Sequence, residues 1–154
     1  NRRALAALGP RVLKLSADRS AGAHPYLVTP EYTKSARETL GAGPLLAVEH
    51  KVALGSDHAS TLAVGRPAVE KPYLGLQNYR ANLRRIGYTD ADLDNGGSDA
   101  LIDALVAQGD PAEVARVVAA HRDAGADHVC LHILPDAGDP LPTLAQLADE
   151  LKLS

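Results

Sequence analysis

The sequence predicts an α/β protein built on a parallel sheet, and three observations support this. Four short apolar runs, near residues 4–8, 23–28, 45–54 and 127–134, have the length and composition of strands. A segment with helical spacing of its apolar residues follows each run. The core of the third run, residues 45–48, is almost continuously apolar, which is typical of a strand covered on both faces. Alternating strands and helices favour parallel strands joined by right-handed crossovers.

Length and composition narrow the protein class. The 154 residues fit one domain, 1–154, and 45% hydrophobic with 23% charged residues is an ordinary globular mixture. A net charge of -3 argues against nucleic-acid binding, which needs clustered Lys and Arg; we interpret Arg80, Arg84 and Arg85 as one solvated helix face. No apolar stretch approaches the roughly 20 residues that span a bilayer. With no signal peptide and a single cysteine, Cys130, inside an apolar run, we expect a cytoplasmic protein.

The first strand leads through Gly9 and Pro10 into a helix that reaches about Arg19. We expect Gly9 to take a conformation barred to other residues, so that the chain turns sharply, and Pro10 suits the first helical position. The turn brings a helix N-terminus, with free N–H groups and the positive end of its dipole, to the C-terminal edge of the sheet. Such a terminus favours an anion such as phosphate. The alternative is an ordinary connecting turn.

The other helices have clear start signals. Thr29 before Pro30 predicts a capped helix that ends at Gly41, and Asp110 before Pro111 predicts another that ends at Gly125. A final amphipathic helix carries leucines 141, 144, 147 and 151. We predict a helical insertion over 56–109 between the third and fourth strands, in broken pieces because of Gly65, Pro67 and Pro72, with Val106 on its last helix. Four such units fit an open doubly wound sheet or half of an eight-stranded barrel.

Several motifs resemble the luciferase-like monooxygenase superfamily, in its branch of coenzyme F420-dependent oxidoreductases. They are Leu5-Ala6-Ala7-Leu8-Gly9-Pro10-Arg11, Gly22-Ala23-His24-Pro25-Tyr26-Leu27-Val28-Thr29-Pro30-Glu31, Tyr73-Leu74-Gly75-Leu76, Asn78-Tyr79-Arg80, Asn82-Leu83-Arg84-Arg85 and Gly125-Ala126-Asp127-His128-Val129-Cys130. The resemblance implies the C-terminal half of a TIM (β/α)8 barrel, with strands five to eight, outer helices and a helical excursion before the last strand. Because strands one to four are missing and the chain opens on Asn1 with no methionine, we expect a truncated protein or a fragment.

The resemblance also implies a function and a site. It implies hydride transfer on a small organic substrate with coenzyme F420, or alternatively FMN, as cofactor. By position, Leu8, Gly9, Pro10 and Arg11 would lie near the cofactor's phosphate and ribityl region. His24, near the start of the second strand, is the best catalytic candidate; the alternative is a histidine bonded to backbone in the barrel wall.

Other polar groups are less specific. Glu49 and Lys51 share a strand face, as an ion pair or as pocket groups. His128 and His132 share a face about 13 Å apart at roughly 3.3 Å per residue, so one metal ion cannot bridge them, and we expect no metal site. Ser56-Asp57-His58 resembles a catalytic triad only in composition.

Three functions therefore stay open. The chain is the C-terminal portion of a redox enzyme, a non-catalytic half-barrel, or a small flavodoxin-like protein that binds an anion at the Gly9 turn. A half-barrel leaves both terminal strands unpaired, so we expect a homo-oligomer or association through the open barrel edges.

Overall fold

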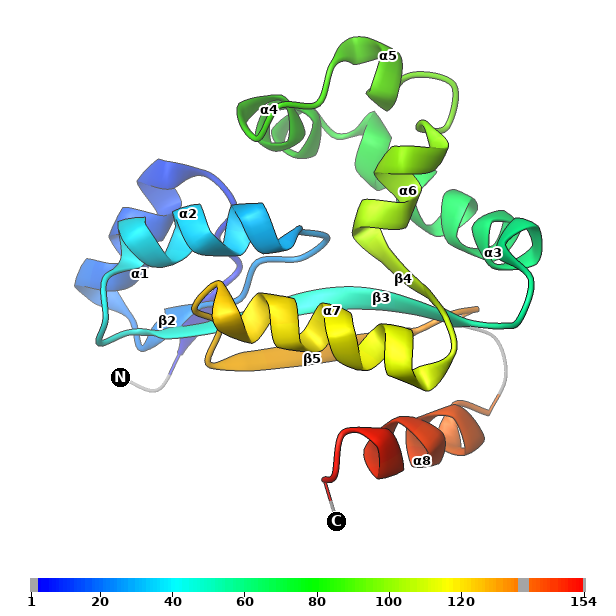
Figure 1. Cartoon of the computed structure of the whole chain (residues 1–154). Coiled ribbons are helices and arrows are strands. Elements are labelled where there is room, and N and C mark those ends of the chain that lie inside the picture. Colours follow the sequence, from blue (N-terminus) through cyan, green and yellow to red (C-terminus); the bar gives the residue numbers. More distant parts are fainter. Residues whose placement is uncertain (1–2, 136–138, 154) are drawn as a thin grey trace.

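The computed structural model describes residues 3–135 and 139–153 and has a parallel sheet at its centre (Figure 1). In these residues the strands are β1 (Ala4–Leu5), β2 (Gly22–Ala23), β3 (Leu45–Leu54), β4 (Val106–Gly109) and β5 (His128–Ile133). β1 pairs with β2, β2 with the start of β3, and β5 with β3 over residues 47–52, all in parallel. The four predicted strands thus lie in sequential order. This is not the 2-1-3-4-5 order of flavodoxin-like sheets, so the flavodoxin-like alternative is wrong.

The first two strands are shorter than the predicted 4–8 and 23–28. Each has only two residues in the ladder. Pairing continues for one step, because the His24 N–H donates to the Leu5 carbonyl. Pro25 then ends the run, since it has no N–H to donate, although its carbonyl accepts the Glu49 N–H.

β4 is a strand that the sequence analysis missed. We expected Val106 to continue a helix, but helix α6 (Asp99–Leu105) ends before it and Val106 begins a strand. β4 pairs with residues 51–54 of β3. The Glu49 N–H points to the edge that receives β2, and the Gly55 N–H, which donates to Gly109, points to the same edge. A short apolar run such as 105–107 suits a helix end or a strand equally well, and pairing with β3 decides between them.

Helices form an outer layer and a separate excursion. The outer layer contains α1 (Pro10–Arg19), α2 (Pro30–Leu40), α7 (Pro111–Asp123) and α8 (Leu141–Glu150). The excursion contains α3 (His58–Glu70), the 3-10 helix η1 (Tyr73–Gly75), α4 (Gln77–Arg85), α5 (Asp90–Leu93) and α6. Thr29 and Asp110 cap α2 and α7 as predicted, by accepting the N–H of Tyr32 and of Glu113.

Helix α3 corrects part of the prediction of broken pieces: it continues through Gly65 and Pro67, and the break falls at Pro72. Gly65 is buried where a Cβ would lie 3.3 Å from Ile102 and Val106, so its small size permits close packing of α3 on α6 and β4. Val69, one turn further on, is fully buried in the core of the excursion. This packing outweighs the cost of one proline at an exposed helix position.

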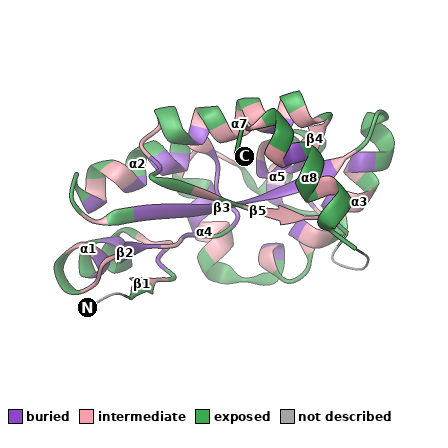
Figure 2. Ribbon diagram, turned by 90° about the horizontal axis from the view of Figure 1, so that it is seen from below, coloured by how far each residue is buried: buried purple, intermediate pink, exposed green. Residues whose placement is uncertain are grey.

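Buried residues concentrate on β3 and on the helix sides that face it (Figure 2). The outer face of the sheet packs on α1, α2 and α7 through apolar side chains, among them Leu13, Tyr32, Leu46, Val48 and Val52. The excursion has its own core, which includes Leu83, Leu93, Leu101 and Leu105 and which Leu27, Ala53 and Leu134 join at the C-terminal ends of the strands. The excursion therefore sits over the sheet end where ligands of parallel α/β proteins bind.

A buried chain of polar groups crosses the outer-face core. The Thr33 hydroxyl donates its hydrogen to the Thr29 carbonyl. Its oxygen therefore accepts a hydrogen bond from His121 Nδ1–H, at 2.8 Å. His121 Nε2 then accepts from His50 Nδ1 at 3.0 Å. In this arrangement each imidazole ring carries one proton, on Nδ1, so both rings are neutral. Burial lowers the pKa of His50 to about 3, with His121 as the next cause, and burial lowers the pKa of His121 to about 4.

We expect this pair to make the protein sensitive to mild acid. Both folded-state pKa values lie below the unfolded value of about 6.5, so the unfolded chain binds more protons and stability is lost as pH falls below 6.5. The free energy of unfolding should fall by about 2–3 kcal/mol between pH 7.5 and pH 5.5. Urea titrations across this range measure the effect. His121→Leu should flatten the pH dependence and the exposed control His58→Leu should not; an equal slope in both variants contradicts the assignment.

Candidate functional site

The inner face of the sheet carries the candidate site. Side chains alternate along a strand, so residues 47, 49 and 51 of β3 and residues 128, 130 and 132 of β5 point away from α2 and α7. A cavity of about 610 Å³ lies on this face at the C-terminal end of β5. Its lining includes His24, Tyr26, Glu49, Tyr73, Cys130 and His132, together with Pro140, Thr143 and Leu144 at the start of α8. Parallel α/β barrels place their active sites at this end of the strands.

Glu49 and Lys51 are buried beneath the inner face, and the partly exposed His132 contacts both of them. Lys51 Nζ lies 3.2 Å from Glu49 Oε1 and 3.0 Å from His132 Nδ1, and His132 Nδ1 lies 3.1 Å from the same carboxylate oxygen. The second oxygen, Glu49 Oε2, accepts the Leu27 N–H at 2.9 Å. The Lys51 side chain is only 2% exposed, so its charge depends on these partners. Glu49 and Lys51 are therefore an ion pair, and Glu49 also lines the pocket.

Two tyrosines lie beside this cluster. The Lys51 ammonium lies 5.2 Å from the centre of the Tyr73 ring, which is a cation–π distance. Tyr73 packs edge-on against Tyr79, with ring centres 4.8 Å apart. Burial, followed by the neighbouring Tyr73 and Glu49, raises the pKa of Tyr79 to about 12. Tyr79 is thus a neutral phenol at physiological pH.

His24, the predicted catalytic candidate, lies on the inner face of the sheet. Its ring is also hydrogen-bonded to the backbone. Its Nδ1 lies 2.7 Å from the Ala47 carbonyl oxygen, which can only accept, so Nδ1 carries the proton. In the neutral ring the lone pair is then on Nε2. Tyr26 packs edge-on against His24 at 4.6 Å, and both rings line the cavity.

The Gly9 turn differs from its prediction. Gly9 has φ -84° and ψ 156°, an extended conformation open to any residue. A Cβ there would have Arg85 Nη2 as its nearest neighbour, at 3.9 Å, so glycine is not required. The N–H groups of Val12 and Leu13 donate back to the Gly9 carbonyl, and Pro10 has none, which leaves the Arg11 N–H at the helix start. The expected set of free N–H groups is therefore much reduced.

The predicted cofactor residues lie apart from the large cavity. Leu8 and Pro10 line a second hollow of about 300 Å³, together with Tyr32, Asn82 and Arg85. Tyr32 supports the turn by donating its hydroxyl to the Leu8 carbonyl at 2.9 Å. Arg85, which we had assigned to a solvated helix face, stands beside Gly9, and Arg80 instead bonds Asp94 and the Leu93 carbonyl. No sequence signal distinguished Arg85 from its neighbours, because only the fold of the excursion brings α4 against α1.

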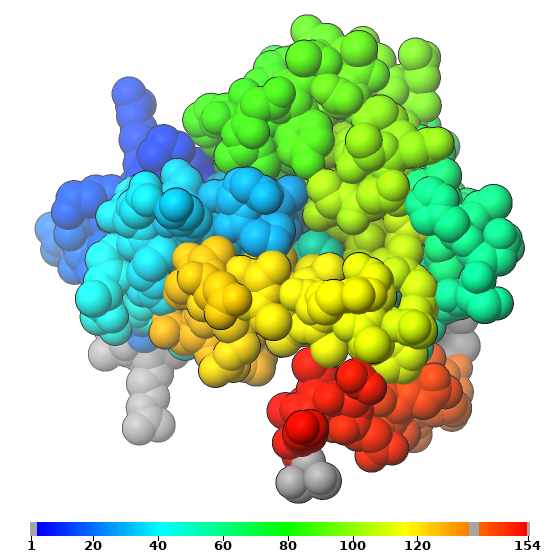
Figure 3. Space-filling view, viewed as in Figure 1, coloured from blue at the N-terminus to red at the C-terminus, as the bar shows by residue number. Residues whose placement is uncertain are grey.

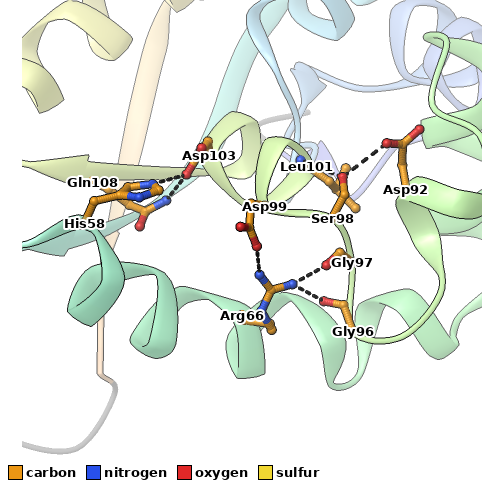
Figure 4. Close-up of polar contacts among 10 residues, drawn as sticks. All are labelled: His58, Arg66, Asp92, Gly96, Gly97, Ser98, Asp99, Leu101, Asp103 and Gln108. Atoms are coloured by element: carbon orange, nitrogen blue, oxygen red, sulfur yellow. Dashed lines mark hydrogen bonds and ion pairs between the residues drawn. The ribbon is translucent and has the colours of Figure 1, made fainter.

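Polar contacts in the excursion are structural (Figure 4). Arg66 on α3 bonds the Gly97 carbonyl and Asp99, which fixes the loop before α6. His58 Nε2 lies 2.8 Å from Asp103, and the hydrogen bond raises the pKa of His58. Asp57 accepts instead from Ser60, as the cap of α3. Ser56-Asp57-His58 thus forms no triad.

In 3–135 and 139–153, His, Cys, Asp and Glu side chains nowhere gather in a group of three that could hold a metal ion. Among the helices of the same residues, none has the length and apolar character needed to cross a membrane.

Comparison with known proteins gives a match in structure only. No protein-family model and no curated protein matches the sequence. An F420-dependent secondary alcohol dehydrogenase, solved with an F420–acetone adduct, matches with a TM-score of 0.62 at 13% identity, over 94% of this chain and 47% of that one. MsnO8, solved in its apo form, matches with a TM-score of 0.62 at 16% identity, over 96% and 50%. The coenzyme F420-dependent tetrahydromethanopterin reductase from Methanopyrus kandleri matches with a TM-score of 0.61 at 18% identity, over 96% and 49%.

At these identities the likeness concerns the fold. The chain spans about half the length of each of the three proteins. Over that half it shares the parallel α/β fold of these proteins.

Proposed function

We propose that this chain supplies the C-terminal half of the active site of a cytoplasmic luciferase-like oxidoreductase, which uses coenzyme F420, or alternatively FMN, to transfer hydride to or from a small organic substrate. The observation that carries the proposal is the cavity of about 610 Å³ at the C-terminal end of β5, in a fold shared with two F420-dependent enzymes. Its volume is typical of a cofactor or substrate pocket.

The lining fits a flat heteroaromatic ring. Tyr26 and Tyr73 offer aromatic surface, and Pro140 and Leu144 offer apolar surface. Glu49, His24 and His132 place polar groups on one wall, which would fix the orientation of a ligand. When bound, a deazaflavin or flavin supplies the hydride chemistry, while the protein binds and orients.

The start of α1 fits the anionic end of such a cofactor by charge. It follows β1, so it stands at the same end of the sheet as the cavity, and the Arg11 and Arg85 guanidinium groups flank it. The positive end of the helix dipole adds to their attraction for a phosphate. We keep Leu8, Gly9, Pro10 and Arg11 as the phosphate-binding segment, with Arg85 added.

Proton transfer is the part of the reaction that the protein's own residues perform. Oxidation of an alcohol to a carbonyl releases a hydride from carbon and a proton from oxygen. We assign the proton to His24, which can accept it at Nε2 because Nδ1 donates to the Ala47 carbonyl. Glu49 and Lys51 hold the His132 ring on the same wall, where it contacts the substrate.

A cofactor titration tests the proposal. We expect saturable binding of coenzyme F420 or FMN by calorimetry. Arg11→Ala should weaken binding roughly tenfold to a hundredfold, because it removes a charged donor to the phosphate, worth about 1.5–3 kcal/mol. Arg19→Ala, at the opposite end of α1, is the matched control and should leave the affinity unchanged. If neither cofactor binds, the non-catalytic half-barrel is the correct interpretation; equal weakening in both variants rejects the phosphate segment.

A further inference from the structure

In the described residues β1 and β5 have open edges, as does the short β4. There β1 pairs only with β2, and β5 pairs only with β3, so each terminal strand has one edge of unpaired backbone groups. The inner face between these edges is also uncovered: Ala4, Ala6, Tyr26, His128 and Cys130 are all exposed there and line one continuous hollow.

The helices beside these edges carry exposed apolar side chains. Val12 and Leu15 on α1 are 40% and 49% exposed, and Leu141 and Leu144 on α8 are 68% and 39% exposed. The members of each pair are three residues apart, so they share a helix face. α1 follows β1 and α8 follows β5, and the two helices lie on opposite sides of the molecule (Figures 1 and 3).

We propose that two copies of this chain associate about a twofold axis, with β5 and α8 of one copy against β1 and α1 of the other. Each terminal strand then gains a parallel neighbour. In the outer layer α8 packs on α1 of the other copy, which covers the exposed leucines. The contact forms twice by symmetry, so the open edges of β1 and β5 are covered in both copies, and the two inner faces enclose one space.

A second copy fits these surfaces better than a different partner. A foreign strand covers one edge and leaves the other open, whereas a second copy covers both. Side-chain sizes also match, because β1 brings Ala4 and Ala6 beside the larger His128, Cys130 and His132 of β5.

Sedimentation equilibrium of the purified chain, without cofactor, tests the association. We expect a species of twice 16.1 kDa. Leu15→Glu and Leu141→Glu should each weaken the dimer at least about a hundredfold, because each substitution acts at both symmetric contacts. Leu76→Glu, on the excursion, is the matched control, since Leu76 is 40% exposed and belongs to none of β1, α1, β5 and α8. A monomer at every concentration, or equal weakening by the control, overturns the proposal.

Disulfide trapping tests the arrangement. Within one copy β1 and β5 are three strand spacings apart, roughly 14 Å, which is beyond the reach of a disulfide. In the dimer, Ala4→Cys or Ala6→Cys on one copy should link to Cys130 of the other upon oxidation. The link should disappear when Cys130→Ser is added, and Ala63→Cys on exposed α3 should not form it. A dimer in which neither position links to Cys130 rejects this pairing, and because no cofactor is involved, the result is independent of the proposed function.

Discussion

Gly22→Ala should destabilise the protein by about 4 kcal/mol or more, the largest effect we expect from adding one methyl group. Gly22 is buried in β2 opposite Leu45, with φ 157°. A Cβ on Gly22 would lie 2.0 Å from the Leu45 carbonyl oxygen and 2.7 Å from its carbonyl carbon. Both are backbone atoms of the central strand, so β2 would have to separate from β3 to relieve the clash.

Thermal and urea unfolding of Gly22→Ala measure this effect. Gly43→Ala is the matched control, since Gly43 has nothing within 4 Å of its Cβ position and does not have a positive φ. We expect the control to unfold like the parent. Because total stability is typically 5–15 kcal/mol, the Gly22 variant should be largely unfolded or fail to accumulate while the control folds normally. A Gly22→Ala protein within about 1 kcal/mol of the parent contradicts the predicted clash.

The sequence was most informative where local chemistry decides the structure. Helix starts such as Thr29-Pro30 and Asp110-Pro111 carry their own caps, so α2 and α7 begin as predicted. The buried strand β3 was equally clear, because a nearly continuous apolar run is typical of a strand covered on both faces of a parallel sheet. These elements were sufficient to predict four parallel strands in sequential order.

Elements decided by distant contacts were harder to predict. Val106 becomes a strand because an edge of β3 is available to it, and α3 continues through Pro67 because the excursion core holds it. At the site, alternation along β3 placed Glu49 and Lys51 on one face, but nothing local showed that His132 and Tyr73 would meet them. Gly9 could adopt a positive φ because it has no Cβ, but the turn before α1 does not use one.

Lys51→Met should cost about 3–5 kcal/mol, because it leaves the Glu49 carboxylate buried without its cation. Glu49→Gln should have a cost of similar size, since it leaves the Lys51 ammonium buried without its anion and weakens the bond to the Leu27 N–H. The double variant Glu49→Gln/Lys51→Met removes both charges together. Its cost should therefore be smaller than the sum of the two single costs, by about 1–3 kcal/mol.

Urea unfolding of the four proteins at pH 7.5 gives this coupling energy. The exposed pair Lys14–Asp18 on α1, joined at 3.0 Å, is the control, and Lys14→Met should change stability by less than about 1 kcal/mol. The difference between the two lysines follows from burial, because water screens the charge of Lys14 and is excluded from that of Lys51. Additive single costs at Glu49 and Lys51 would show that the two charges do not depend on each other. A coupling of the expected size shows that Glu49 and Lys51 stabilise the protein as a pair.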